Sequence, residues 1–296
     1  MVGGWGSNWT TKKLDVFEKY VKAYLTIMET YKNKYNWQTL YFDGFAGSGG
    51  RNINNNTEAT NNSLSLELFD IEYIETEEYK GAAERVSNLA KKFDHYLFVD
   101  SNAESLRKLQ EKLSTCDIDH KLQFRTGDAN EYIKALAEIL KKDKKIKALV
   151  LLDPFGMQIN WESIELLKDT YTDIWILIPS GVIVNRLLDR EGNLEHINKL
   201  CKFFGMNENE VRDEFYVKKD SPSLFGNETI IQKKKEPIDK IANLYIKKLK
   251  RIWKYVMPEP LIMKNRKNVA IFHFVFASKN PTGFKIAKDI IRKVSI

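Results

Sequence analysis

A short apolar strand that runs directly into a cluster of glycines is the feature that most limits how this chain can fold. Residues Thr39–Gly50 read T-L-Y-F-D-G-F-A-G-S-G-G, and Leu40–Phe42 form the apolar, β-prone part. Glycine adopts positive φ and has no Cβ, so its backbone N–H groups can approach a ligand closely. The stretch predicts a buried strand entering a cofactor loop, although a tight strand-to-helix turn without a ligand explains the glycines alone equally well.

Apolar strands and helical segments continue to alternate after this loop. Further strands are expected at His95–Asp100, Leu122–Phe124, Ala148–Leu152 and Ile174–Ile178, with helices at 101–113 and 131–141 between them. Fully apolar strands are typical of parallel sheets that helices cover on both faces. The sequence therefore predicts a Rossmann-like, doubly wound α/β fold. Its mostly parallel, seven-stranded sheet would end in an antiparallel hairpin formed by Leu261–Met263 and Ala270–Ala277.

The chain is expected to form one domain, residues 1–296, with two additions. Residues 1–36 form an N-terminal helical extension with one apolar stripe, and residues 182–255 form a helical insertion between strands five and six that contains a loop at Lys218–Asn227. Ser63–Phe93 should be mainly helical, with a break near Tyr79–Gly81. The polar, Asn-rich stretch Arg51–Asn62 is expected to be an exposed loop, either a lid beside the cofactor or a solvated insertion.

Composition limits the functional class. With 296 residues and 43% apolar content, the chain can bury a large core, and its formal charge of +7 favours an anionic partner such as nucleic acid. The two cysteines, Cys116 and Cys201, and the four scattered histidines suggest neither a disulfide framework nor a metal site. No apolar run approaches membrane-spanning length and no signal peptide is visible, so we expect a cytoplasmic protein.

Acidic residues follow several of the predicted strands. Asp100 ends the second strand, where a carboxylate can accept hydrogen bonds from a ribose diol, but the same position could also cap the helix that follows. Asp128 follows the third strand in G-D-A-N, and Asp153 begins D-P-F-G directly after the fourth. Because parallel strands end at the same edge of a sheet, we expect these residues to meet the glycine loop there.

These motifs together resemble the class I S-adenosylmethionine-dependent methyltransferases. Y-F-D-G-F-A-G-S-G resembles the first motif of that family, and Asp100, Gly127–Asp128 and Asp153–Gly156 follow in the order of its later motifs. The resemblance implies S-adenosylmethionine as cofactor, with Asp100 and Ser101 at the ribose, Asp128 and Ala129 at the adenine, and Asp153 near the methyl group. It also places a run of residues along the methionine part: Asp43, Gly44, Phe45, Ala46, Gly47 and Gly49.

A narrower resemblance is to the three-Cys-motif partner (TcmP) family. It rests on the pairing of Y-F-D-G-F-A-G with L-L-D-P-F-G, on a preceding W-T-x-K-like helix and on a later F-F-G, and it covers most of the chain. This resemblance implies that a partner protein takes part in function. A methyltransferase-like subunit that depends on such a partner is therefore an alternative to an independent enzyme.

The D-P-F-G turn suggests the chemistry. Methylation of an exocyclic base amine needs an acceptor that orients the nitrogen and an aromatic face that stacks on the flipped base. By resemblance to tRNA dimethylguanosine methyltransferases, which share this spelling, Asp153, Pro154, Phe155 and Gly156 are the candidate catalytic residues. The alternative is that Asp153 caps a helix and Phe155 is a core residue.

The insertion is the candidate substrate-binding region. Its lysines lie among aromatic residues such as Phe215, Tyr216, Tyr245 and Trp253, so phosphate contacts and base stacking would both be available. A solvated charged face is the competing interpretation, and methylation of a small molecule or protein fits the cofactor motifs equally well. The candidate substrate-binding residues are Lys233, Lys234, Lys235, Lys247, Lys248 and Arg251.

Overall fold

The computed structural model describes residues 8–51, 79–223, 226–265 and 267–295. A central sheet has the strand order β10-β12-β7-β6-β1-β4-β5. Its five parallel strands are β1 (Gln38–Asp43), β4 (His95–Asp100), β5 (Leu122–Thr126), β6 (Ile146–Leu152) and β7 (Thr172–Ile178). The antiparallel strand β12 (Ala270–Ser278) pairs with β7. The predicted doubly wound, mostly parallel sheet is therefore confirmed.

At the edge of the sheet next to β12, the outermost strand consists of two separate pieces. Both β10 (Tyr255–Val256) and β11 (Leu261–Lys264) pair antiparallel with β12, at successive positions along it. Pro258 and Pro260 lie between these two pieces and cannot donate backbone hydrogen bonds to the ladder. The predicted terminal hairpin of β11 and β12 is present.

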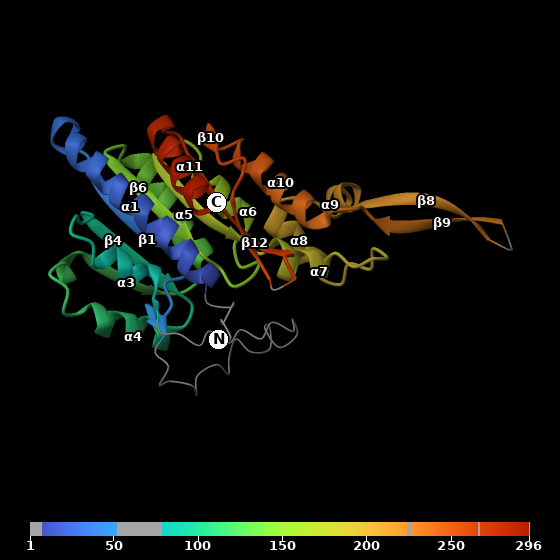
Figure 1. The fold of residues 1–296 in the computed structure, drawn as a ribbon, viewed down its shortest axis with the longest axis horizontal. Helices are drawn as coiled ribbons and strands as arrows, with labels where there is room; N and C mark the ends of the chain where they lie inside the picture. Colours follow the sequence, from blue (N-terminus) through green and yellow to red (C-terminus); the bar gives the residue numbers. More distant parts are fainter. Residues whose placement is uncertain (1–7, 52–78, 224–225, 266, 296) are drawn as a thin grey trace.

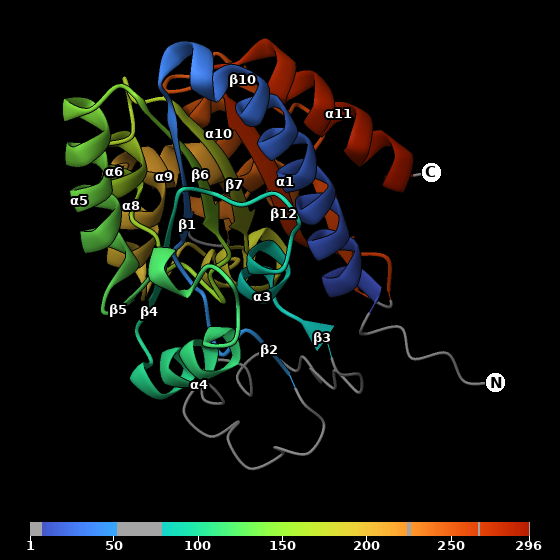
Figure 2. The same cartoon turned by 90° about the vertical axis from the view of Figure 1, so that its left-hand side faces the viewer.

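Helices cover both faces of the sheet, as Figure 2 shows. One face carries α1 (Asn8–Tyr35), α11 (Pro281–Ser295), α3 (Ala82–Ser87) and α4 (Ala103–Leu113), and the other carries α5 (Ala129–Lys142), α6 (Trp161–Glu165), α8 (Ile197–Phe204) and α10 (Pro237–Leu249). Successive strand residues point to opposite layers, so Tyr41 packs under α1 while Phe42 joins the α5 side. This double burial explains why the strands are apolar throughout.

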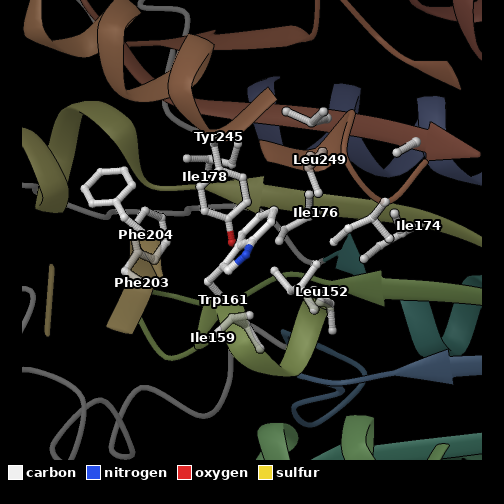
Figure 3. Close-up of a cluster of buried hydrophobic side chains, with 14 of the residues drawn as sticks. Leu152, Ile159, Trp161, Ile174, Ile176, Ile178, Phe203, Phe204, Tyr245 and Leu249 are labelled. Atoms are coloured by element: carbon white, nitrogen blue, oxygen red, sulfur yellow. The ribbon is translucent and has the colours of Figure 1, made fainter. Parts of the chain in front are cut away.

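The insertion packs firmly on the α5 side of the sheet. Tyr245 of α10 contacts Trp161 and Phe203, with ring centroids 5.4 and 5.0 Å away, in the apolar cluster that Figure 3 shows. Gly205 ends α8 in a left-handed conformation, with φ of 57°. The insertion therefore shares the main core.

One expectation about secondary structure was wrong, and a second can be compared with the structure only in part. The polar segment expected to be a loop at Lys218–Asn227 lies mostly in a hairpin of β8 (Tyr216–Ser223) and β9 (Gly226–Lys233), which follows α9 (Glu208–Phe215) and projects from the body in Figure 1. Within the expected helical region Ser63–Phe93, the break expected near Tyr79–Gly81 is present, because Tyr79–Lys80 form β3. Among the residues of this region that the structure describes, only α3 is helical. The rest of that region, up to residue 78, and the Asn-rich stretch from residue 52 to 62 lie outside the described residues.

Candidate active site

The glycine loop begins at the carboxyl end of β1 and is held tightly against its neighbours. The backbone N–H of Gly44 donates to the carbonyl of Leu151 (3.0 Å), and that of Ala46 donates to the carbonyl of Val99 (2.9 Å). A Cβ on Gly44 would lie 2.8 Å from a methyl carbon of Leu152, so any larger residue would have to displace that side chain. Beyond it, Gly47 has φ of 58°, and no atom of the described residues lies within 4 Å of where its Cβ would be. The loop is thus packed on one side and open on the other.

Asp100 ties the glycine loop to β4. Its Oδ2 accepts from the N–H of Gly47 at 2.8 Å, and its Oδ1 accepts from the N–H of Asn102 at 2.8 Å. The cap of α4 is the side chain of Asn102, which accepts from the N–H of Ser105. The alternative role of Asp100 as the helix cap is therefore wrong. Ser101 is exposed beside it.

Asp43 is a buried carboxyl at the end of β1, with 1% of its surface exposed. It accepts from the hydroxyl of Tyr41 at 2.9 Å and from the N–H of Phe45 at 3.2 Å. The pKa of Asp43 is raised to about 7, mainly by burial; the two hydrogen bonds lower it, and the nearby charges of Asp153 and Asp100 add to the rise. Three carboxyl groups therefore converge at this edge of the sheet.

Asp128 and Ala129 lie at the start of α5. Asp128 is exposed and caps the helix, because its Oδ1 accepts from the N–H of Asn130 at 2.9 Å. The side chain of Asn130 then reaches the loop after β6, donating to the carbonyl of Gln158 (2.7 Å) and accepting from the N–H of Asn160 (2.9 Å). Sequence reasoning missed Asn130, which fixes the relative position of the two loops.

The D-P-F-G turn follows β6 and has no helix to cap. The next helix, α6, begins after Asn160, and the Oδ2 of Asp153 instead meets the Nζ of Lys13 at 2.5 Å. Phe155 is 58% exposed, so it is not a core residue. The alternative interpretation, in which Asp153 caps a helix and Phe155 is a core residue, is therefore wrong for both residues.

Lys13 of α1 is a site residue that the sequence pattern did not reveal. Its side chain is only 8% exposed, and it carries a positive charge into the group of carboxyls around Asp153. A lysine one position before the apolar stripe of an amphipathic helix gives no signal of its own. Only the packing of α1 across the sheet brings it to the turn 140 residues later.

The six proposed substrate-binding residues do not form one surface. Lys233 is half-buried and donates to the side-chain and backbone oxygens of Asn185, and Lys248 donates to the carbonyl of Gly205 (3.2 Å) with its ammonium 4.8 Å from the Trp161 ring centre. Lys234 donates to the carbonyl of Asp213 at 2.6 Å. The other three are exposed: Lys235, Lys247 and Arg251.

The aromatic residues expected to stack on bases in the insertion are core residues. Phe215, Tyr216, Tyr245 and Trp253 are between 0% and 6% exposed. The expectation that they interleave with lysines on a binding surface is therefore wrong, because the apolar face of the insertion is turned onto the sheet.

No protein-family model matches the chain, and no curated protein matches its sequence. Among solved structures, protein LPL1258 from Legionella pneumophila is similar over 95% of this chain and 91% of its own, with 13% identity and a TM-score of 0.50. A SAM-dependent methyltransferase from Methanosarcina mazei matches at 12% identity over 82% of this chain and 92% of its own (TM-score 0.32). A methyltransferase from Geobacter sulfurreducens matches at 10% identity over 71% and 78% (TM-score 0.28).

Strand order and direction define the class of fold. Five parallel strands are followed by one antiparallel strand next to β7, the last of them, which is the Rossmann-like, doubly wound arrangement that the sequence predicts. The described helices include none that is both long and apolar enough to cross a membrane.

Proposed function

We propose that this chain is an S-adenosylmethionine-dependent methyltransferase that acts on an exocyclic amine of a nucleic-acid base. The observation that carries the proposal is the exposed ring of Phe155 next to Asp153, at the sheet edge where the glycine loop opens. An exposed aromatic residue beside a carboxylate is what recognition of a flipped base amine requires.

The residues present fit the cofactor. The open side of Gly47 leaves room near the loop backbone, and each Asp100 oxygen accepts only one backbone N–H among the hydrogen bonds described above, so lone pairs remain for a ribose diol. Asp43, Gly44, Phe45, Ala46, Gly47 and Gly49 would face the methionine part, and Ser101, Asp128 and Ala129 would lie toward the nucleoside. We also propose that the carboxylates of Asp100 and Asp153 favour the cationic end of the ligand.

The chain's own groups would position the acceptor. Bound S-adenosylmethionine supplies an electrophilic methyl group. Asp153 would accept a hydrogen bond from the target amine through Oδ1, while Lys13 holds Oδ2 and so fixes the carboxylate plane. Phe155 would stack on the base, and Pro154 and Gly156 shape the turn, with the N–H of Gly156 donating to the side chain of Gln158 (2.8 Å).

A nucleic-acid target is supported by charge rather than by the buried aromatics of the insertion. The outward face of α10 and the turn after it carries Lys247, Lys250 and Arg251, all exposed, and the chain has a formal charge of +7. We retain Lys235, Lys247 and Arg251 as substrate-binding residues, and assign Lys233, Lys234 and Lys248 mainly to holding the insertion together.

Transfer of a tritiated methyl group to RNA and to DNA tests the proposal, followed by mass spectrometry of the nucleosides to identify the base. Phe155→Tyr preserves a stacking ring and should retain activity. Phe155→Leu removes it and should weaken acceptor use by about 1–3 kcal/mol, the range for base stacking. Equal activity of both variants would remove the role of Phe155, and transfer to proteins or small molecules alone would refute the nucleic-acid target.

A further inference from the structure

The exposed aromatic side chains of the described residues are unevenly distributed. Phe155 lies at the candidate active site, and the others gather at the opposite edge of the sheet, where the strands begin: Tyr31, Tyr35 and Tyr171, which are 44%, 46% and 52% exposed. Because β6 is seven residues long, roughly 20 Å of strand separates the two edges. The three tyrosines therefore cannot belong to the active site.

These tyrosines form a row with Trp37. Tyr31 and Tyr35 lie one turn apart on the last part of α1, with ring centroids 6.2 Å apart, and Tyr35 stacks on Trp37 at 4.8 Å and 22°. Asn36 turns the chain between them with φ of 50°. The ammonium of Lys147 then lies 4.7 Å from the centre of the Trp37 ring and 3.4 Å from that of Tyr171. We call Tyr31, Tyr35, Trp37 and Tyr171 the aromatic row.

Neighbouring strands fix the row in place. The N–H of Ala148 donates to the carbonyl of Tyr171 (3.1 Å), and the N–H of Gln38 donates to the carbonyl of Lys145 (3.1 Å). The starts of β1, β6 and β7 thus hold one end of the row, while the last turns of α1 hold the other. The exposed rings are therefore attached to hydrogen-bonded parts of the fold.

Lysines surround the aromatic row. Lys34 lies 5.2 Å from the centre of the Tyr35 ring, and Lys144 and Lys145 are exposed at the start of β6. Lys144 and Lys168 both lie near Lys279, and the acidic residues of this edge include Asp143, Asp169 and Asp94, the last of which is paired with Lys32. Burial, with a smaller contribution from the charge of Lys144, lowers the pKa of Lys147 to about 8, so Lys147 remains mostly protonated at neutral pH. The edge is therefore positively charged.

We infer that the aromatic row is a binding surface for single-stranded nucleic acid. Exposed rings with lysines between them are what single strands use, because unpaired bases stack on the rings while the phosphates meet the cations. A duplex hides its bases from such a surface, and an acidic peptide would engage the lysines without needing the rings. The choice of ligand rests on the proposed nucleic-acid target, but binding at this edge requires neither cofactor nor methyl transfer.

Anisotropy of labelled single-stranded and duplex oligonucleotides of one length, without cofactor, tests the inference. Tyr35→Ala and Tyr171→Ala should each weaken single-strand binding roughly 5- to 150-fold, the range for losing one stacked base. Tyr35→Phe and Tyr171→Phe keep the rings and should bind as the parent does. Thermal unfolding of all four variants checks that they are folded.

The charge component has its own pair of variants. Lys34→Gln with Lys145→Gln should flatten the slope of log affinity against log salt by about 0.7 for each phosphate that the protein no longer neutralises. Lys288→Gln with Lys293→Gln removes the same charge from exposed positions of α11 and should leave the slope unchanged.

Three results would overturn the inference: unchanged single-strand affinity in the folded alanine variants, equal losses in the alanine and phenylalanine variants, or competition by polyglutamate as strong as that by the oligonucleotide. Methyl transfer separates this inference from the proposed function. A parent protein that binds single strands through these rings but transfers no methyl group would refute the enzyme and leave the surface standing. Normal methyl transfer together with unaffected single-strand binding in the alanine variants would refute the binding surface and leave the enzyme standing.

Discussion

Replacement of Asp43 by Asn is expected to stabilise the folded chain at high pH. Asp43 is 1% exposed, and burial raises its pKa from 3.8 to about 7. Asn has the same shape. Its Oδ1 can accept from the N–H of Phe45 and its Nδ2 can donate to the Tyr41 hydroxyl, so the two hydrogen bonds of Asp43 can both be replaced.

The sign of the effect follows from the protons bound in each state. Between pH 4 and about pH 7 the folded chain keeps a proton on Asp43 that the unfolded chain has lost, so stability falls as pH rises through this window. The slope from this group is at most about 1.4 kcal/mol per pH unit, and a shift of roughly three units corresponds to about 4 kcal/mol. Asn never ionises. The variant should therefore match the parent near pH 4 and exceed its stability by up to about 4 kcal/mol at pH 8.

Urea unfolding of parent and variant at pH 4.5 and pH 8 measures this difference. The pKa of Asp173, which burial raises to about 6, adds a slope of the same sign to both proteins, and this slope cancels on comparison. Asp289→Asn, at an exposed position of α11, is the matched control and should show no such gain. If the Asp43 variant gains equally at both pH values, or loses stability at pH 8, the reasoning about burial is wrong.

Three further changes probe the site and the insertion. Asp153→Ala should abolish methyl transfer while S-adenosylmethionine affinity stays within a few fold; near-normal turnover would exclude Asp153 as the group that orients the amine. Lys13→Met leaves the Asp153 carboxylate unpaired and should cost about 3 kcal/mol in urea unfolding, with the double variant Lys13→Met/Asp153→Asn losing less than the sum; additive losses would show that the pair is not coupled. Lys247→Gln with Arg251→Gln should weaken nucleic-acid binding and flatten its salt slope by about 0.7–0.9 for each phosphate no longer neutralised, whereas a solvated face predicts no change.

The sheet could be predicted because both of its faces are buried. Strands such as β6 and β7 must be apolar at every position, and that pattern is visible without a structure. The hairpin of β8 and β9 could not be predicted from the sequence. Its segment K-K-D-S-P-S is polar and lacks the alternation of apolar and polar residues that marks a strand. Its two strands pair with each other and not with the central sheet. The glycine loop and its acidic partners were predictable from chain order alone.

The side-chain partners of the site residues could not be predicted from the sequence. The ion pair of Lys13 with Asp153 and the bridge from Asn130 to Gln158 join residues that only the packing of α1 and the meeting of two loops bring together. The prediction that aromatic residues of the insertion lie on a binding surface was wrong for the same reason. Its lysines and aromatics alternate in sequence, but helix geometry turns Tyr245 into the core and leaves Lys247 outside.

Calorimetric titration with S-adenosylmethionine tests the central claim most directly. We expect saturable binding by the parent protein and by Asp117→Ala, an exposed control. Asp100→Ala should bind more weakly by about 2–4 kcal/mol, because it loses charge-assisted hydrogen bonds to the ribose and the anchor of Gly47. Absence of binding to the folded parent, for the cofactor and for its demethylated product alike, would contradict the account, and an unchanged affinity in Asp100→Ala would place the ribose elsewhere.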